Sequence, residues 1–212
     1  MAIYRFENDA MCSLENRALS EGYTTVAGID EAGRGALAGP VVAACVVLDP
    51  PNIPSGILDS KKLTDRKRRT LYKQIRETAV CVGIGLMGPR IIDEVNIYNA
   101  TVLAMKGAIA DLDQQPDFLL IDAVKLYDIS ISSKSIFKGE DKSVSIAAAS
   151  IIAKVYRDDL MISISRSYPQ YKFFAHKGYA TEAHKRALTL YGPTSHHRYS
   201  YRPVHEAFEQ WR

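Results

Sequence analysis

Residues 28–42 read GIDEAGRGALAGPVV and join two apolar segments through a pair of acids and a glycine-rich turn. Two adjacent acids, Asp30 and Glu31, at the end of a buried strand destabilise a fold unless a cationic group meets them. The glycines at 33 and 35 give up side-chain packing and leave the backbone accessible. Together these features predict a metal ion beside a phosphate group.

The apolar segments on both sides of this stretch predict a sheet. Residues 24–30 and 39–49 form its first two strands, and the connection of about ten residues favours an antiparallel hairpin over a crossover. Three further strands are predicted at 80–87, 117–122 and 134–141.

Helical patterns fill the gaps between these strands. They cover residues 5–20, 64–79, 96–112, 143–167 and 181–190. Thr64 is a predicted N-cap, and the Ala-rich start of the helix at 143–167 indicates close packing against the sheet near the site. The pattern predicts an α/β fold in one domain, residues 1–212, with a small helical C-terminal region from about residue 165.

The composition is that of a globular protein. The chain has 212 residues, 47% apolar and 24% charged, enough for one sizeable core without a long disordered tract. Its three cysteines are widely spaced, which argues against structural zinc and a disulfide framework. The polar N-terminus does not match a signal peptide, and no apolar run approaches the ~20 residues of a membrane span. We therefore expect a soluble, cytoplasmic protein with no membrane association.

Two groups of residues have ambiguous roles in the sequence alone. The net charge is only +3, yet basic residues cluster at Lys61, Lys62, Arg66, Lys67, Arg68 and Arg69. Charge alone leaves open whether this cluster is a solvated helix face or a nucleic-acid contact. The five histidines, His176, His184, His196, His197 and His205, are interpreted as structural braces of the C-terminal region.

The acids are the strongest chemical signal. Asp30-Glu31 and Asp122 end predicted strands, and Glu140-Asp141 precedes the long helix. Ligands of open α/β sheets bind at strand ends, and gathered carboxylates repel unless a divalent cation joins them. Oxygen ligands select Mg²⁺ or Mn²⁺, and two such ions about 4 Å apart suit phosphodiester hydrolysis. The alternative is that each acid is simply a solvated strand-end residue.

Adjacent residues on a regular strand point to opposite faces. Asp30 and Glu31 can then share one site only if the strand breaks there, and Gly33 and Gly35 are placed to break it. Other chemistries lack their motifs, because the chain has no phosphate-binding P-loop, no dinucleotide fingerprint and no nucleophile elbow.

Six motifs follow one another along the chain: GIDEAGRG, LDSKKL, IDAVKL, KGEDKSVSIAAASIIAKVYRD, HKGYATEAH and GPTSHHRYSY. In order and spacing the chain resembles ribonuclease HII, the type 2 ribonuclease H, from about Val26 to Tyr201. The resemblance implies a ribonuclease H-like mixed sheet flanked by helices, with a small helical C-terminal region. It also implies hydrolysis, with two Mg²⁺ or Mn²⁺ ions, of RNA strands paired with DNA. Nicking 5′ to single ribonucleotides in duplex DNA, leaving 3′-hydroxyl and 5′-phosphate ends, is implied too. We expect a monomer.

The resemblance also assigns roles to residues of this chain. The residues that match metal-binding positions are Asp30, Glu31, Asp122 and Glu140. Those assigned to substrate binding are Gly33, Arg34, Gly35, Lys61, Tyr179 and Lys154. Arg157 is expected to be a further contact to the nucleic-acid backbone. Glycines let backbone groups read the 2′-hydroxyl that distinguishes RNA from DNA. Tyr179 matches the tyrosine that reads the junction between ribonucleotide and deoxyribonucleotide.

Several points stay open at this stage. The motif position favours Glu140 as the fourth acid, whereas residue type favours Asp141. Ala36 and Ala180 depart from the family pattern, and both are expected to be tolerated. Whether Ala180 restricts the turn that holds Tyr179 stays open. The rival functions are a metal-dependent DNA nuclease of the same broad fold and a non-enzymatic hybrid-binding protein.

Overall fold

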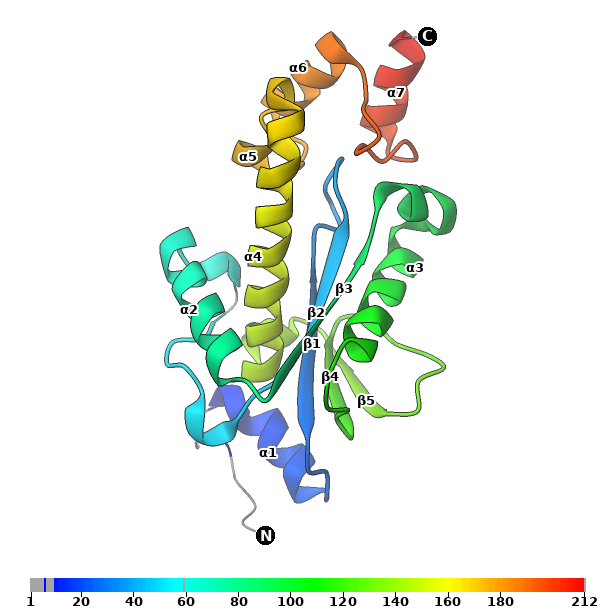
Figure 1. Cartoon of the computed structure of the whole chain (residues 1–212). Helices are drawn as coiled ribbons and strands as arrows, with labels where there is room; N and C mark the ends of the chain where they lie inside the picture. Colours follow the sequence, from blue (N-terminus) through cyan, green and yellow to red (C-terminus); the bar gives the residue numbers. More distant parts are fainter. Residues whose placement is uncertain (1–5, 7–9, 59, 212) are drawn as a thin grey trace.

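The computed structural model describes residues 6, 10–58 and 60–211 and contains a five-stranded sheet in the order β3-β2-β1-β4-β5 (Figure 1). Its strands are β1 Val26–Ala32, β2 Val41–Val47, β3 Cys81–Met87, β4 Phe118–Asp122 and β5 Ser132–Ile136. The first three strands pair antiparallel, while β4 and β5 run parallel to β1. The predicted hairpin and mixed sheet are therefore confirmed.

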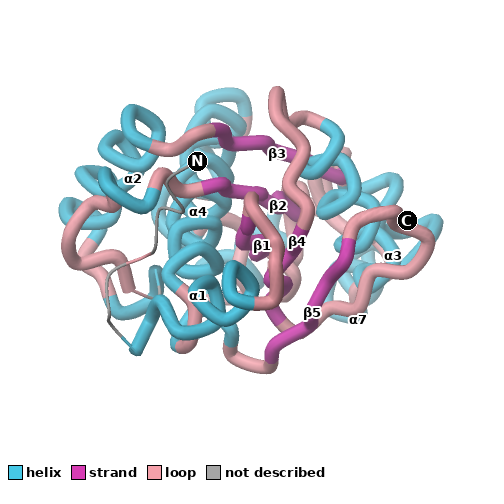
Figure 2. Tube along the Cα trace, turned by 90° about the horizontal axis from the view of Figure 1, so that it is seen from below, coloured by secondary structure: helices cyan, strands magenta, loops and turns pink. Residues whose placement is uncertain are grey.

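Helices cover both faces of the sheet. They are α1 Ser13–Ser20, α2 Asp65–Thr78, α3 Pro89–Ala110, α4 Val144–Ser167, α5 Phe173–His176, α6 Glu182–Tyr191 and α7 Arg202–Trp211. Short 3-10 turns lie at Ala10–Cys12, Pro50–Asn52, Ser60–Lys62, Gly139–Asp141 and Pro169–Tyr171. Helices α1, α2 and α4 lie on one face and α3 on the other (Figure 2). None of the helices in the described part of the chain is long and apolar enough to cross a membrane.

The uniformly apolar sequence of strand β2 follows from the helices that cover both faces of the sheet. All residues of β2 are apolar and buried, because α4 and α3 shield its two faces. Helix α4 packs so closely on β1 that a Cβ at Gly28 would overlap the backbone of Ser145. The prediction of a close-packed Ala-rich helix is thus confirmed, and α4 places its first turns beside the end of β1.

Two caps fix the helices that flank the site. The hydroxyl of Thr64 accepts a hydrogen bond from the Lys67 amide, which confirms the predicted N-cap of α2. The hydroxyl of Ser143 does the same for Ile146 at the start of α4. Glu15 of α1 is buried and accepts hydrogen bonds from the Ser143 hydroxyl and the Ser145 amide, at 2.5 and 3.0 Å. Helix α1 therefore anchors the N-terminus of α4.

Some predicted boundaries are wrong. The fifth strand ends at Ile136, not 141, because Lys138 turns the chain with a left-handed φ of 54°. Helix α3 begins at Pro89 and is kinked at Asn96, where the predicted helix began. The start of the predicted helix at 5–20 falls partly on residues 5 and 7–9, which lie outside the described residues.

The C-terminal region is more helical than predicted. Helix α6 confirms the predicted helix at 181–190, but α7 was not predicted. Its sequence RPVHEAFEQW places Val204, Ala207 and Phe208 at helical spacing, and the first two are buried. Helices α5, α6 and α7 gather at the end of the molecule opposite α1 (Figure 1).

Candidate active site

Two neighbouring strand ends bring the first two acids together. Strands β1 and β4 are parallel, with Ile29 paired to Ile121. The next residue on each strand is an acid, Asp30 and Asp122, so both project to the same face at the same edge. The Gly139 amide donates to Asp122 at 2.7 Å, which ties the turn that carries Glu140 to the end of β4.

Glu31 reaches this cluster without the predicted break in the strand. Pairing of β1 with β2 continues through Glu31 and Ala32, so the expected interruption at 30–31 is wrong. The chain turns only afterwards, at Gly33, with φ +96°. This turn brings Arg34 back over Glu31, with 3.2 Å between Nη1 and Oε1.

The four carboxyl groups of Asp30, Glu31, Asp122 and Glu140 perturb one another. Burial, and then repulsion by Glu31 and Asp122, raises the pKa of Asp30 well above its usual value. Burial also raises the pKa of Glu31, although Arg34 opposes it. Burial, with repulsion by Glu140, raises the pKa of Asp122 to about 6. The cluster therefore resists full ionisation unless cations compensate it.

Glu140 is ionised more readily because a lysine faces it. Burial opposes ionisation, but a backbone hydrogen bond and the Lys61 ammonium outweigh it and lower the pKa of Glu140. Lys61 Nζ lies 3.2 Å from Glu140 Oε1, and the lysine side chain is 76% exposed. Lys61 therefore joins the acid cluster from the solvent side.

The donor set fits a hard divalent cation. Glu31 Oε2 and Glu140 Oε2 are buried with no hydrogen-bond partner, and buried polar atoms normally have one. As the side chains lie, no group of three His, Cys, Asp or Glu residues among the described ones is arranged to hold an ion. Arg34 and Lys61 instead neutralise one oxygen each of Glu31 and Glu140. The second oxygen of each of these two carboxylates stays without a partner.

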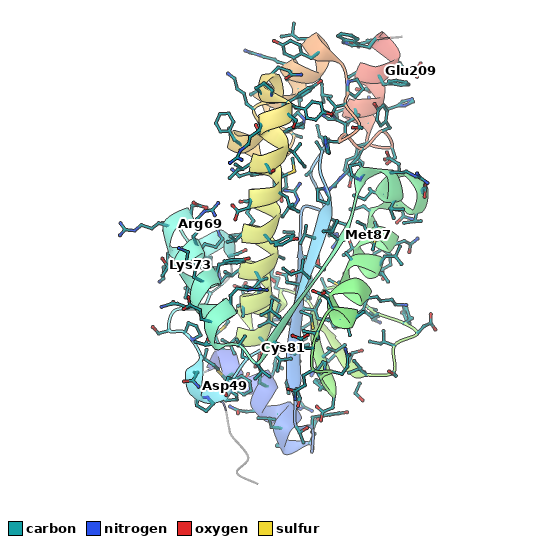
Figure 3. The ribbon with its side chains drawn as sticks, viewed as in Figure 1. Asp49, Arg69, Lys73, Cys81, Met87 and Glu209 are labelled. Carbon is teal, nitrogen blue, oxygen red and sulfur yellow. The ribbon has the colours of Figure 1, made fainter. Side chains whose placement is uncertain are left out.

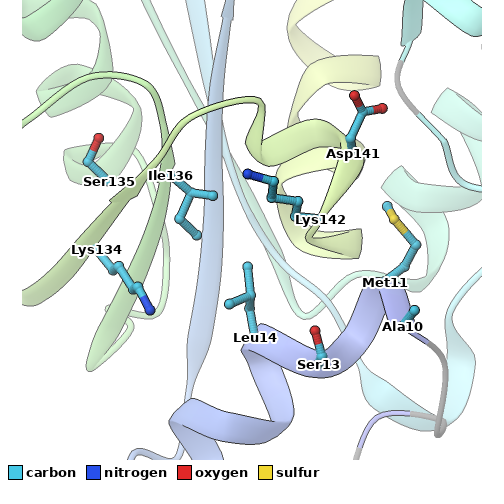
Figure 4. Close-up of a pocket in the computed structure, with 9 residues that line it drawn as sticks. All are labelled: Ala10, Met11, Ser13, Leu14, Lys134, Ser135, Ile136, Asp141 and Lys142. Atoms are coloured by element: carbon cyan, nitrogen blue, oxygen red, sulfur yellow. The ribbon is translucent and has the colours of Figure 1, made fainter.

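Asp141 lies outside this cluster. It pairs with Lys62 at 2.5 Å and lines a separate pocket of about 480 Å³ with Met11, Leu14 and Ile136 (Figure 4). Glu140, the neighbouring residue, is 7% exposed and faces the other acids. Of the two candidates, the structure brings only Glu140 to the carboxylate cluster.

Asp30 and Glu31 open onto a cleft of about 440 Å³ that gathers most of the predicted substrate residues. It is lined by Asp30, Glu31, Ala32, Gly33, Arg34, Gly35, Ser60, Lys61, Ser150, Lys154 and Tyr179. Sequence analysis missed Ser60 and Ser150, whose hydroxyls hydrogen-bond at 2.7 Å. Ser60 precedes the motif lysine, but Ser150 resembled an ordinary small residue of a packed helix.

The two glycines of the loop have different reasons to be glycine. Gly33 has φ +96°, and a Cβ there would overlap the Arg157 side chain. Gly35 has an ordinary φ, and a Cβ there would meet nothing within 4 Å. The fold therefore requires Gly33, whereas at Gly35 the missing side chain only leaves the cleft open.

Two buried arginines hold this loop. Arg198, fully buried, donates to the carbonyls of Gly33, Arg34 and Gly39 at 2.7–3.0 Å. Sequence analysis did not assign it a role, although it lies in the motif GPTSHHRYSY.

Arg157 holds the other side of the loop. Its guanidinium donates to the carbonyls of Pro40, Ala38 and Lys177 at 2.9–3.1 Å. Burial lowers its pKa to about 10. The predicted contact between Arg157 and the nucleic-acid backbone is wrong, because the side chain has no exposed surface.

Tyr179 lies at the edge of the cleft. The Arg157 guanidinium and the Lys154 ammonium lie over its ring, at 5.3 and 5.5 Å from the centroid. Lys154 also pairs with Asp158 at 2.9 Å. Ala180 is exposed and has no positive φ, which agrees with the expectation that alanine is tolerated at this position.

The family model for ribonuclease HII matches residues 27–204 of the chain. The chain belongs to the ribonuclease HII family. It is 47% identical to the ribonuclease HII of Caldicellulosiruptor bescii over 92% of this chain and 95% of that protein. It is 52% identical to the Acetivibrio thermocellus ribonuclease HII over 90% of this chain and 75% of that protein. As a member of this family, the chain is a ribonuclease H enzyme that acts on RNA–DNA hybrids, which excludes the non-enzymatic alternative.

Solved structures agree with this fold. The ribonuclease H2 of Pyrococcus horikoshii superposes with a TM-score of 0.76 at 25% identity, covering 89% of this chain and 99% of that one. The ribonuclease HII of Archaeoglobus fulgidus, solved in a complex with PCNA, gives 0.73 at 25% identity, covering 84% and 95%. The expected ribonuclease H-like mixed sheet flanked by helices is therefore confirmed.

The basic cluster near the site of this ribonuclease HII divides into two parts. Arg68 is buried and donates to the carbonyls of Ser60 and Leu63 at 2.9 and 2.7 Å, so it holds the turn that carries Lys61. Arg69 instead pairs with Asp65 and with Asp159 of α4, at 3.1 and 2.7 Å, so it ties α2 to α4. Lys73, further along α2, is exposed (Figure 3). Arg68 and Arg69 therefore have structural contacts, whereas Arg66 and Lys67 are exposed.

We expect Glu140→Gln to lose at least about tenfold in hydrolysis rate at limiting Mg²⁺, equivalent to about 1.4 kcal/mol of barrier. The reason is that, of Glu140 and Asp141, only Glu140 faces the other carboxylates. Asp141→Asn, the matched control, should stay near the wild-type rate because Asp141 pairs with Lys62 on the surface. The reverse pattern in the two rate measurements would identify Asp141 as the fourth acid.

Proposed function

We propose that this enzyme, acting as a monomeric single catalytic domain over residues 1–212, also nicks duplex DNA 5′ to single embedded ribonucleotides. The observation that carries the proposal is Gly35, whose missing side chain has no structural cause. It leaves backbone groups of the loop accessible next to the carboxylate cluster. Backbone donors and acceptors can recognise a 2′-hydroxyl where a side chain would keep the sugar away.

We propose Mg²⁺ or Mn²⁺ as the cofactor, two ions per site, held by Asp30, Glu31, Asp122 and Glu140. When bound, such ions activate a water molecule and stabilise the leaving oxygen of the phosphodiester. The unpartnered oxygens of Glu31 and Glu140 and the raised pKa values of Asp30 and Asp122 support this assignment. Proton transfer by any one carboxylate is not part of the proposal.

The remaining cleft residues would bind and orient the substrate. Lys61 and Lys154 reach phosphate groups, contacts that position the duplex without reading its sequence. Arg34 pairs with Glu31 in this structure, and it would move to a phosphate when metal neutralises the acid. Tyr179 offers an aromatic face at the edge of the cleft, suited to packing against the sugar or base beside the junction.

Three duplexes of one sequence test the proposal: all-DNA, DNA with one ribonucleotide, and an RNA–DNA hybrid. Each is incubated with Mg²⁺, with Mn²⁺ and with a chelator. We expect cleavage of the second and third duplexes only, and only with metal. Cleavage of all-DNA duplex would support the DNA nuclease alternative, and hydrolysis of the hybrid alone would refute the nicking activity.

Gly35→Ala is expected to leave the melting temperature unchanged while cleavage at a single ribonucleotide falls about tenfold or more. A Cβ at this position meets no protein atom, so any effect must come from the substrate. Gly107→Ala is the matched control, because its Cβ would meet only the Gly85 backbone at an ordinary 3.5 Å, away from the site. Full activity in Gly35→Ala would remove the main support for recognition by this loop.

Tyr179→Ala should selectively weaken cleavage at a single ribonucleotide. One stacked base contributes on the order of 1–3 kcal/mol, a loss that a long hybrid offsets through its other contacts. The measurement is kcat/KM on both substrates. Equal losses on both would argue that Tyr179 does not read the junction.

A further inference from the structure

The C-terminal region contains a hydrogen-bond chain whose direction is fixed by the protein backbone. His197 Nδ1 lies 2.9 Å from the Thr194 amide, and an amide N–H can only donate. Nδ1 of His197 therefore carries no proton, and the ring proton of the neutral imidazole must be on Nε2. The Thr194 hydroxyl lies 3.0 Å from the same nitrogen.

The proton on His197 sets the tautomer of a second histidine. His197 Nε2 lies 3.0 Å from His184 Nε2, so His197 donates and His184 accepts. The proton of neutral His184 is then on Nδ1, which lies 2.9 Å from the carbonyl oxygen of Tyr179. The Thr181 amide donates to the same carbonyl at 2.8 Å. The chain runs in one direction, from Thr194 through both imidazoles to Tyr179.

The surroundings keep both imidazoles neutral. His184 and His197 are fully buried, and the rings of Tyr171 and Phe173 pack against them. Burial lowers the pKa of His184 to about 4 and that of His197 to about 3. His176 stacks on His184 and lowers the pKa of both rings further.

We propose that His184 and His197 are positioning residues that set the backbone of Tyr179 for reading the ribonucleotide junction. The proposal rests on the role of Tyr179 given above. Neither histidine is among the residues that line the cleft, and His184 contacts it through the Tyr179 carbonyl. The structural bracing predicted for the histidines is thus directed, in this pair, at one residue of the site.

The tautomers test the hydrogen-bond chain without any activity measurement. Long-range ¹⁵N–¹H NMR spectra of the whole protein at neutral pH distinguish the two tautomers of each imidazole. We expect His184 protonated on Nδ1 and His197 on Nε2, both neutral. The same tautomer in both rings, or a charged ring in either, would overturn the chain.

Variants test whether the chain acts through Tyr179. His197→Asn keeps an acceptor near the Thr194 amide but removes the donor to His184, so cleavage at a single ribonucleotide should fall about tenfold, mainly in kcat. His184→Leu should lose as much, and His184→Asn, which restores a donor near the Nδ1 position, should recover part of it. His205→Asn, at an exposed histidine of α7, is the matched control and should resemble wild type.

A double-mutant comparison separates positioning from a general loss of structure. On a Tyr179→Ala background, His184→Leu should cause no further loss, because the aromatic side chain that the backbone positions is already gone. Additive losses would overturn the proposal, as would wild-type activity in folded His184→Leu and His197→Asn. If Tyr179→Ala itself leaves single-ribonucleotide cleavage intact, the role proposed for Tyr179 fails, whatever the NMR spectra show for the tautomers.

Discussion

Asp30→Asn and Asp122→Asn are each expected to reduce hydrolysis of an RNA–DNA hybrid by about a thousandfold or more, about 4 kcal/mol of barrier. Both side chains end neighbouring parallel strands and face the same cluster, so an amide removes charge that metal ions require. The measurement is kcat at saturating Mg²⁺. Asp113→Asn, an exposed acid elsewhere, should keep the wild-type rate.

The same variants should be more stable than wild type when no metal is added. The pKa of Asp122 is raised to about 6 in the folded state, so folding favours its protonated form. The stability contributed by this proton is fully present below the ordinary aspartate pKa and is lost as the pH rises through about 6. Because Asp122 is only partly buried, solvent screening reduces the gain of Asp122→Asn at pH 8 to about 1 kcal/mol, or roughly 2–4 °C in melting temperature. The gain should vanish near pH 4. Activity within a few-fold of wild type, or a lower melting temperature at pH 8, would contradict the account.

Arg198→Lys should be the most damaging substitution outside the acid cluster. Its guanidinium donates hydrogen bonds to the carbonyls of Gly33, Arg34 and Gly39 at once. A lysine ammonium cannot reproduce the planar arrangement of these donors. Buried carbonyls left without donors should lower the free energy of unfolding by about 2–4 kcal/mol. Thermal unfolding measures this loss.

Activity should fall further than the folded fraction explains, because the loop carrying Gly35 loses its support. Comparing kcat/KM with the folded fraction at the assay temperature separates the two effects. Arg202→Lys is the control, since Arg202 is exposed on α7 and pairs with Glu206 on the surface. Wild-type stability and activity in Arg198→Lys would show that the loop is held by other contacts.

The parts of the site that are local in sequence could be predicted. Asp30 and Asp122 were identified because each directly follows an apolar strand, and the sheet order then makes them neighbours. Glu140 was placed by its motif, although the turn that presents it was misread as strand. That turn depends on the left-handed Lys138 and on the bond from Gly139 to Asp122, neither of which leaves a periodic signal.

The supporting contacts could not be predicted because they join distant segments. Arg198 meets Gly33 across a sequence separation of 165 residues, and His197 reaches Tyr179 only through His184. Arg157 resembled a substrate contact because it follows Lys154 on the same helix. The packing of α4 against the loop shows instead that the Arg157 guanidinium donates its hydrogen bonds to the backbone carbonyls of Pro40 and Ala38.

The nicking activity proposed above requires that this site direct water to the phosphodiester on the 5′ side of a recognised ribonucleotide. The ribonucleotide's own 2′-hydroxyl can attack only the phosphate on its 3′ side, so the ends of the nick identify the nucleophile. The most direct measurement maps both ends on a DNA duplex with one ribonucleotide and Mg²⁺. The account predicts a 3′-hydroxyl on one fragment and a 5′-phosphate on the fragment that begins with the ribonucleotide. A 2′,3′-cyclic phosphate, or a ribonucleotide left at a 3′ end, would contradict it.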